Sequence, residues 1–170
     1  AVIADSWYQA KTAIDKMPIE WDVPPVNARF TTANMRESLL ASLDRPGTVR
    51  ASQGDVDTAF KNATRIVKAT YSTPFLPRAR MEPGNATVLV SNDRVDIWIG
   101  DQSPQETRFS ASKITGIPET NVHIHLCHLG GGFGRNGNGP QAEHAIMIAN
   151  AHRGTPIHML WTREEDFIGT

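Results

Sequence analysis

The spacing of apolar residues predicts a chain that contains both helices and strands. Apolar positions that recur every second residue predict strands, and those that recur every three or four residues predict helices. We expect strands at 19–23, 65–71, 87–91, 95–99, 121–128 and 157–161, and helices at 7–17, 35–43, 55–63, 104–114 and 141–152. The pattern therefore predicts an α+β fold with a mixed β-sheet and packed helices.

Three of these helices carry specific side-chain expectations. Leu39, Leu40 and Leu43 fall on one side of helix 35–43 and are expected to be buried. Asp55 precedes helix 55–63 at its capping position. Residues 103–106 read Ser-Pro-Gln-Glu, which has the form of a capping box, with a serine and a glutamate that cap the helix start reciprocally.

The most unusual stretch is the loop at 129–140, which reads LGGGFGRNGNGP. It follows the predicted strand 121–128 and precedes helix 141–152. Glycine lowers the cost of positive φ and removes Cβ atoms from the path of a ligand, so successive N–H groups can converge on an anionic or oxo group. We therefore predict a ligand-binding glycine loop, whose backbone directs Phe133 and Arg135.

Two other interpretations of this loop remain open. Residues 132–137 fit the dinucleotide-binding pattern G-x-G-x-x-G, and a strand precedes them. The predicted helix starts only after Pro140, however, and Ile157 stands where an acidic ribose ligand is expected. The second interpretation is a long glycine turn without a ligand.

A second junction between a strand and a helix holds Gln102. If the strands that precede Gln102 and the glycine loop are neighbours in one sheet, the two junctions lie side by side. That edge is where α/β sheets tend to bind ligands. The alternative for Gln102 is an ordinary surface amide in a loop.

One strand carries a row of possible metal ligands. His123, His125 and Cys127 share one face of the strand 121–128. Three ligands from a single strand rarely surround a zinc ion, and no complementary pair stands elsewhere. We therefore expect packed or solvent-facing side chains rather than a metal site.

Charged residues near both ends of the predicted sheet also have two interpretations. Glu82 is either a buried carboxylate paired with Arg78 or Arg80, or a charge at the start of a strand. The run 163–166 is expected to form a solvated helix cap.

Composition restricts the classes of function. The net charge of −1 gives no electrostatic attraction to nucleic acid or to an anionic membrane. No apolar run approaches the about 18 residues that a membrane span needs. The single cysteine excludes an internal disulfide framework. We expect the sequence to be a piece of a longer polypeptide.

Four ordered motifs resemble a known family. LGGGFGR at 129–135, Gln102 after a strand, Met81-Glu82-Pro83 and the stretch 161–166 occur in an order similar to that of the molybdenum-binding subunit of the xanthine oxidase and aldehyde oxidase family. The closer likeness is to the two-subunit bacterial branch typified by the isoquinoline 1-oxidoreductase beta subunit. The resemblance covers essentially the whole chain.

The resemblance implies an enzyme that hydroxylates a carbon of an aldehyde or an N-heterocycle with oxygen from water. It implies a molybdopterin cofactor that carries molybdenum, in the cytosine dinucleotide form, and no protein ligand to the metal. The residues that match the cofactor-contacting motifs are Gln102, Gly131, Gly132, Phe133, Gly134 and Arg135. The general base is expected outside this chain, so no catalytic residue is assigned within it.

The resemblance also implies an organisation and partners. Residues 1–48 would continue from a preceding domain, and 49–170 would form part of the molybdopterin-binding domain. A partner subunit with iron–sulfur clusters would receive the electrons, and either the bacterial cytoplasm or the periplasm suits the sequence. The alternative class of function is a non-catalytic dinucleotide-binding or assembly module.

Overall fold

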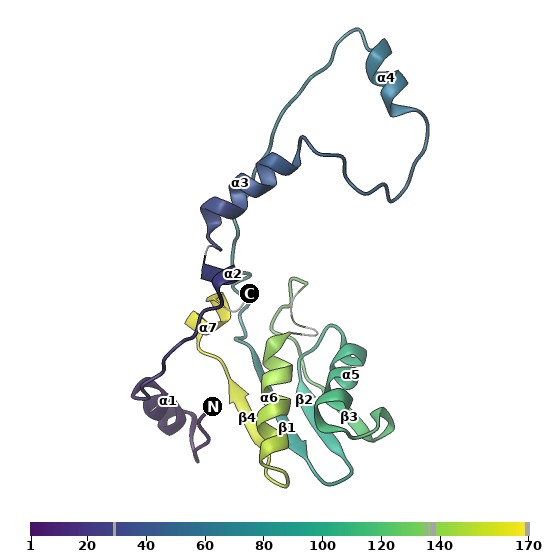
Figure 1. Cartoon of the computed structure of the whole chain (residues 1–170). Coiled ribbons are helices and arrows are strands. Elements are labelled where there is room, and N and C mark those ends of the chain that lie inside the picture. Colours follow the sequence, from purple (N-terminus) through teal and green to yellow (C-terminus); the bar gives the residue numbers. More distant parts are fainter. Residues whose placement is uncertain (29, 135, 137–138, 169–170) are drawn as a thin grey trace. The chain divides into compact units, whose positions relative to one another are not determined.

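The computed structural model describes residues 1–28, 30–134, 136 and 139–168 (Figure 1). Within the chain, Ala1–Asp15 and Pro74–Thr170 form one compact unit, and Lys16–Thr73 form another. Each unit is described by itself. Within the described residues, no helix is both long and apolar enough to cross a membrane.

The first unit is built on a four-stranded sheet in the order β3-β2-β1-β4. Strand β1 (Asn85–Val90) is antiparallel to both β2 (Val95–Ile99) and β4 (Ile157–Leu160). Strand β3 (Val122–Leu126) is parallel to β2, with Ile97 opposite Ile124. The sheet is thus mixed, which confirms the predicted α+β class. The two predicted strands 87–91 and 95–99 correspond to β1 and β2, which form an antiparallel hairpin.

Two helices pack on one face of this sheet (Figure 1). Helix α5 (Pro104–Thr115) contacts β3, while helix α6 (Pro140–Ala151) contacts β1 and β4 and also packs against α5. Alternation along β1 places Ala86, Val88 and Val90 under the helices, each fully buried. The core is completed by buried apolar side chains of α6, namely Ala142, Ala145, Ile146 and Ala149. The three alanines are small and let the helix approach the sheet closely.

The start of α5 differs from the predicted capping box. The Ser103 side chain makes no capping hydrogen bond. Instead, the Asp101 carboxylate accepts hydrogen bonds from the Ser103 N–H at 2.7 Å and from the Thr107 hydroxyl at 2.5 Å. The predicted box is therefore wrong, because Asp101, and not Glu106, accepts from the Ser103 N–H. The helix ends at Gly116, whose φ of +74° is the left-handed conformation favoured at this position.

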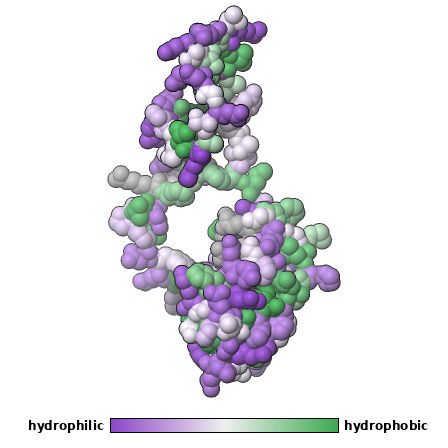
Figure 2. Space-filling model, turned by 90° about the vertical axis from the view of Figure 1, so that its right-hand side faces the viewer, coloured by the Kyte–Doolittle hydropathy of each residue, from purple (hydrophilic) through white to green (hydrophobic). Residues whose placement is uncertain are grey.

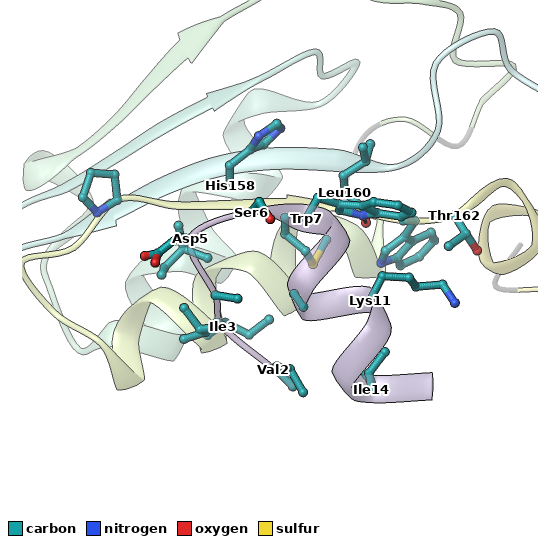
Figure 3. A pocket seen from close by; sticks show the side chains of 18 of the residues that line it. Val2, Ile3, Asp5, Ser6, Trp7, Lys11, Ile14, His158, Leu160 and Thr162 are labelled. Atoms are coloured by element: carbon teal, nitrogen blue, oxygen red, sulfur yellow. Dashed lines mark hydrogen bonds between the residues drawn. The ribbon is translucent and has the colours of Figure 1, made fainter. Parts of the chain in front are cut away.

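The remaining elements of the first unit flank the sheet. Helix α1 (Trp7–Asp15) ends two residues before the predicted limit, and the Trp7 indole N–H donates to the Leu160 carbonyl of edge strand β4 at 3.0 Å. A pocket of about 610 Å³ lies between the N-terminal segment, α1 and β4 (Figure 3). The turn η1 (Glu119–Asn121) precedes β3, and helix α7 (Arg163–Ile168) follows β4.

The second unit contains three short helices, α2 (Pro25–Ala28), α3 (Thr32–Ser42) and α4 (Val56–Asn62). Asp55 caps α4 as predicted, with its carboxylate accepting from the Thr58 N–H at 3.0 Å. Among the described residues of 16–73 none is buried, and apolar side chains lie on the surface, as the green spheres in Figure 2 show.

Several predictions for this unit are wrong. Residues 19–23 and 65–71 form no strand, because a strand needs a paired neighbour and neither segment has one. Leu39, Leu40 and Leu43 are exposed rather than buried, because no described residue of this unit covers that side of α3. Amphipathic spacing shows which side of a helix can be buried, but burial requires other residues that pack against that side.

Candidate functional site

The two junctions singled out in the sequence meet at one edge of the sheet. Gln102 follows β2, and the glycine loop follows β3. Because β2 and β3 are parallel neighbours, their carboxyl ends lie at the same edge, which confirms that the junctions are side by side (Figure 1). The backbone joins them directly, since the Gln102 N–H donates to the Asn136 carbonyl at 2.6 Å.

The Gln102 side chain is hydrogen-bonded to the glycine loop. Its Oε1 accepts a hydrogen bond from the Asn136 N–H at 3.1 Å. A Cβ atom placed on Gly132 would overlap with the Gln102 amide group, so only glycine fits at this position without a rearrangement. Gln102 is therefore tied to the loop rather than being an isolated surface amide. Its Nε2 has no hydrogen-bond partner among the described residues.

The loop backbone has the properties expected of an anion-binding turn. The φ angles of Gly131, Phe133 and Gly134 are +99°, +48° and +77°. A positive φ is uncommon for phenylalanine, whose side chain is 69% exposed here. Across the described residues, the N–H groups of Gly131–Gly134 have no hydrogen-bond acceptor. Four successive donors without an acceptor, next to the Gln102 amide, fit a ligand with oxo or anionic groups.

Five of the six residues predicted to contact the cofactor are described in the structure. The structure brings Gln102, Gly131, Gly132, Phe133 and Gly134 together at one edge of the sheet. Arg135 lies outside the described residues. Helix α6 begins at Pro140, after the glycine run, so the loop lacks the helix start within the run that a dinucleotide fingerprint requires.

Glu82 lies beside the glycine loop, but with partners other than those predicted. Its Oε2 accepts from the Gly130 N–H at 2.6 Å, and its Oε1 accepts from the Asn85 side-chain amide at 2.8 Å. Arg78 instead donates from Nε to the Phe133 carbonyl at 3.1 Å. Of the two interpretations of Glu82, the pairing with an arginine is wrong, because backbone and amide donors occupy both carboxylate oxygens.

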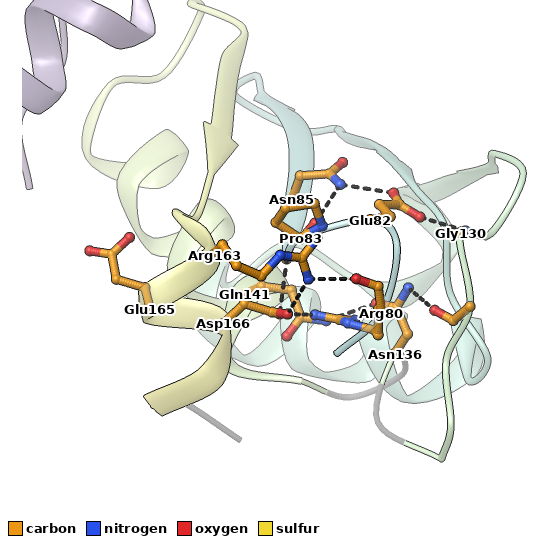
Figure 4. A network of polar contacts seen from close by, with 12 residues as sticks. Arg80, Glu82, Pro83, Asn85, Gly130, Asn136, Gln141, Arg163, Glu165 and Asp166 are labelled. Carbon is orange, nitrogen blue, oxygen red and sulfur yellow. Dashed lines mark hydrogen bonds and ion pairs between the residues drawn. The ribbon is translucent and has the colours of Figure 1, made fainter. Parts of the chain in front are cut away.

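A buried ion pair joins the segment before β1 to helix α7 (Figure 4). Arg80 Nη2 lies 2.6 Å from Asp166 Oδ1, and the two side chains are 3% and 2% exposed. Asp166 also accepts from Arg163 at 3.2 Å. The run 163–166 is thus not simply a solvated cap. Sequence reasoning missed this pair because its members are 86 positions apart and nothing local in the chain links them.

The row of histidines on β3 makes contacts within the sheet. His125 Nε2 lies 2.7 Å from Asp96 Oδ1, and its ring stacks on Trp98 with centroids 4.7 Å apart. In the part of the chain that the structure describes, no group of three or more His, Cys, Asp or Glu side chains is placed to hold a metal. The expectation of a packed histidine is confirmed for His125.

Asp96 is the described residue with the clearest electrostatic perturbation. Arg94 donates to its two oxygens from Nε and Nη2 at 2.6 and 2.7 Å. These hydrogen bonds are the largest cause that holds the pKa of Asp96 well below its ordinary value. Desolvation acts in the opposite direction, and the contact with His125 lowers the pKa further.

The lowered pKa of Asp96 predicts a loss of stability in acid. Because the folded-state pKa lies below the unfolded value of about 3.9, the ionised carboxylate stabilises the fold above that pH. This contribution is lost as the pH falls through the folded-state pKa. We expect the free energy of unfolding of the chain to decrease below about pH 4, and to decrease less steeply in Asp96→Asn. Denaturant titrations over this range measure both slopes, and equal slopes would contradict the assignment.

Comparisons show which known proteins this chain is similar to. The model of the molybdopterin cofactor-binding domain matches residues 42–170. Nicotine 6-hydroxylase large subunit of Paenarthrobacter nicotinovorans is 29% identical over 177 residues, which cover 98% of this chain and 21% of that protein. Aldehyde oxidase 2 of Mus musculus is 27% identical over 174 residues, which cover 100% of this chain and 13% of that protein.

A solved structure shares the fold. The Cu,Mo-CO dehydrogenase matches with a TM-score of 0.64 at 20% identity, over 94% of this chain and 22% of that one. The chain spans about a fifth of the length of nicotine 6-hydroxylase large subunit, and less of the mouse oxidase. The match over residues 42–170 nevertheless covers most of this chain. The chain therefore belongs to the family of molybdopterin cofactor-binding domains, within the xanthine oxidase and aldehyde oxidase group.

Proposed function

We propose that this chain is part of the large subunit of a molybdenum hydroxylase that oxidises an aldehyde or an N-heterocycle with oxygen derived from water. Its role is to form one wall of the cofactor site. The observation that carries the proposal is the glycine loop, where four successive N–H groups and the Gln102 amide lack acceptors among the described residues. This wall has the donors that an oxygen-rich cofactor requires.

The residues that would hold the cofactor are Gln102 and Gly131–Gly134, with Arg135 proposed from its motif alone. The bound molybdopterin group supplies the two-electron oxidation of the substrate carbon. The chain contributes fixed hydrogen-bond donors, which need no reorganisation when charge develops on a nearby oxygen. Gln102 contributes its Nε2 donor, because its Oε1 is already held by the Asn136 N–H at 3.1 Å.

The same proposal includes finer features of the complete enzyme. The cofactor is in the cytosine dinucleotide form, and electrons leave to a partner subunit with iron–sulfur clusters. One relative is the large subunit of nicotine 6-hydroxylase, and that name supports a division of the complete enzyme into several chains. Residues 1–48 would link to a preceding domain, and 49–170 would belong to the cofactor domain, a division supported by a family match that starts at 42. The general base would come from outside this chain.

The proposal predicts that the 170-residue chain alone is catalytically inert. It offers one wall of the site and no general base, and the loss of a base alone removes about 10² to 10⁴ in rate. We expect purified chain to carry substoichiometric molybdenum and no iron, whereas the full-length enzyme with its partner carries both. Elemental analysis and aldehyde turnover measure the difference.

Two results would contradict this assignment. Stoichiometric cofactor together with turnover in the chain alone would show that the site is complete within it. Saturable binding of NAD to the chain, with no molybdenum in the full-length protein, would favour the dinucleotide-binding module instead.

A further inference from the structure

We infer that Arg80 and Asp166 are positioning residues for the glycine loop, acting through the short segment 80–84. This segment lies between helix α7 and Gly130, and we call it the bracket (Figure 4). The inference rests on the proposed function, because it concerns the placement of the loop that would bind the cofactor.

Both ends of the bracket, Arg80 and Gly84, are fixed to α7. Asp166 Oδ1 accepts from Arg80 Nη2 at 2.6 Å and from the Gly84 N–H at 3.3 Å. Arg163 donates from the same helix to the Arg80 carbonyl, and to the Met81 carbonyl at 2.9 Å. Three residues of the bracket are thus held by two side chains of α7, one of which is almost completely buried.

The middle of the bracket, Glu82, is fixed to the start of the glycine loop. Glu82 Oε2 accepts from the Gly130 N–H at 2.6 Å, which is a charge-assisted hydrogen bond. A Cβ atom on Gly130 would overlap with the Glu82 side chain, so the two backbones are in close approach. A shift of the bracket would therefore move Gly130, which directly precedes the four N–H donors that have no acceptor among the described residues.

The energetics of the ion pair suit a positioning role better than a purely stabilising one. Arg80 Nη1 is buried and has no hydrogen-bond partner among the described residues, so the guanidinium is not fully satisfied. The desolvation of a buried ion pair offsets much of its attraction, and an apolar pair of similar volume is often as stable. What the charged pair adds is a defined position, because its hydrogen bonds fix where the bracket lies relative to α7.

The experiment uses the full-length enzyme with its cofactor and partner. The variants are Arg80→Met, Asp166→Asn and the double variant, which removes both charges while the asparagine keeps an acceptor for the Gly84 N–H. The matched control is Lys11→Met with Asp15→Asn, which removes a partly exposed ion pair on α1. Two quantities are measured: the midpoint of thermal unfolding, and the rate at which molybdenum is lost on dialysis.

Each single variant leaves a less well compensated buried charge and should lower the unfolding midpoint. The double variant should unfold closer to wild type, yet still lose molybdenum about 10 to 100 times faster, as is typical when an outer support of a cofactor site is removed. The control should change neither quantity appreciably. A double variant that recovers both the midpoint and the slow loss of molybdenum would show that the pair is only structural and would overturn the inference.

A second arm tests the path through the bracket. Glu82→Ala should speed the loss of molybdenum by a similar factor, and adding the double variant to Glu82→Ala should give no further increase, because both act through Gly130. If the increases caused by Glu82→Ala and by the double variant multiply, the two do not act through the same path to Gly130. Failure of the proposed function is distinguishable, because the wild-type enzyme would then contain no molybdenum to lose.

Discussion

Gly132→Val should abolish stable cofactor binding in the full-length enzyme. The new Cβ would overlap with the Gln102 amide, whose Oε1 holds the Asn136 N–H, so the loop and its support cannot both keep their positions. The branched side chain would also stand beside the N–H groups of Gly131–Gly134, which lack an acceptor among the described residues. We expect molybdenum content and turnover to fall by about 100-fold or more, since supports of a cofactor site are commonly worth about 10 to 100-fold each. Elemental analysis and steady-state kinetics measure both.

A smaller change at the same position separates the two reasons for that loss. In Gly132→Ala with Gln102→Ala, the overlap between the two side chains is removed, while a Cβ remains beside the free N–H groups. If the cofactor binds this loop, the molybdenum content stays low in the double variant and is higher in Gln102→Ala alone, which has no Cβ at position 132. Full recovery in the double variant would mean that Gly132 serves only the internal packing of the loop.

Gly134→Val is a useful comparison because its physical cause is different. Gly134 has a φ of +77°, and a Cβ there would meet nothing within 4 Å. The cost is therefore conformational, about 1–2 kcal/mol for a residue with a side chain in the left-handed region. The effect on cofactor content should be clearly smaller than that of Gly132→Val.

The sheet and the site edge were predictable because their signals are local. Alternation along 87–91 and 95–99 identified the hairpin, and glycine density identified the loop after β3. The sequence left open whether β2 and β3 are neighbours, and the structure shows that they pair in parallel. Parallel strands require a crossover connection. Helix α5, which lies between β2 and β3 in the sequence, provides that connection.

The contacts that hold the glycine loop in place were not predictable, because their signals are not local. The contacts of Glu82 with Gly130 and of Arg80 with Asp166 join residues 48 and 86 positions apart. Carboxylates and arginines at such separations carry no periodic pattern, and several pairings are equally compatible with the sequence. The start of α5 was ambiguous in the same way. Both Asp101 and Glu106 could accept from the Ser103 N–H, and the sequence alone did not decide between them.

Ile97→Ala should destabilise the chain by about 2–5 kcal/mol, whereas Leu39→Ala should change its stability by at most about 0.5 kcal/mol. Both substitutions remove three carbon atoms, so they are matched in chemistry and differ in burial. Ile97 is fully buried on β2 beneath the helices, whereas Leu39 is 56% exposed on α3. Apolar spacing alone predicts burial of both residues, and the structure assigns the folding energy to the unit that contains the sheet. Urea denaturation followed by circular dichroism measures the two differences, and an equal loss in Leu39→Ala would show that α3 packs against other residues in solution.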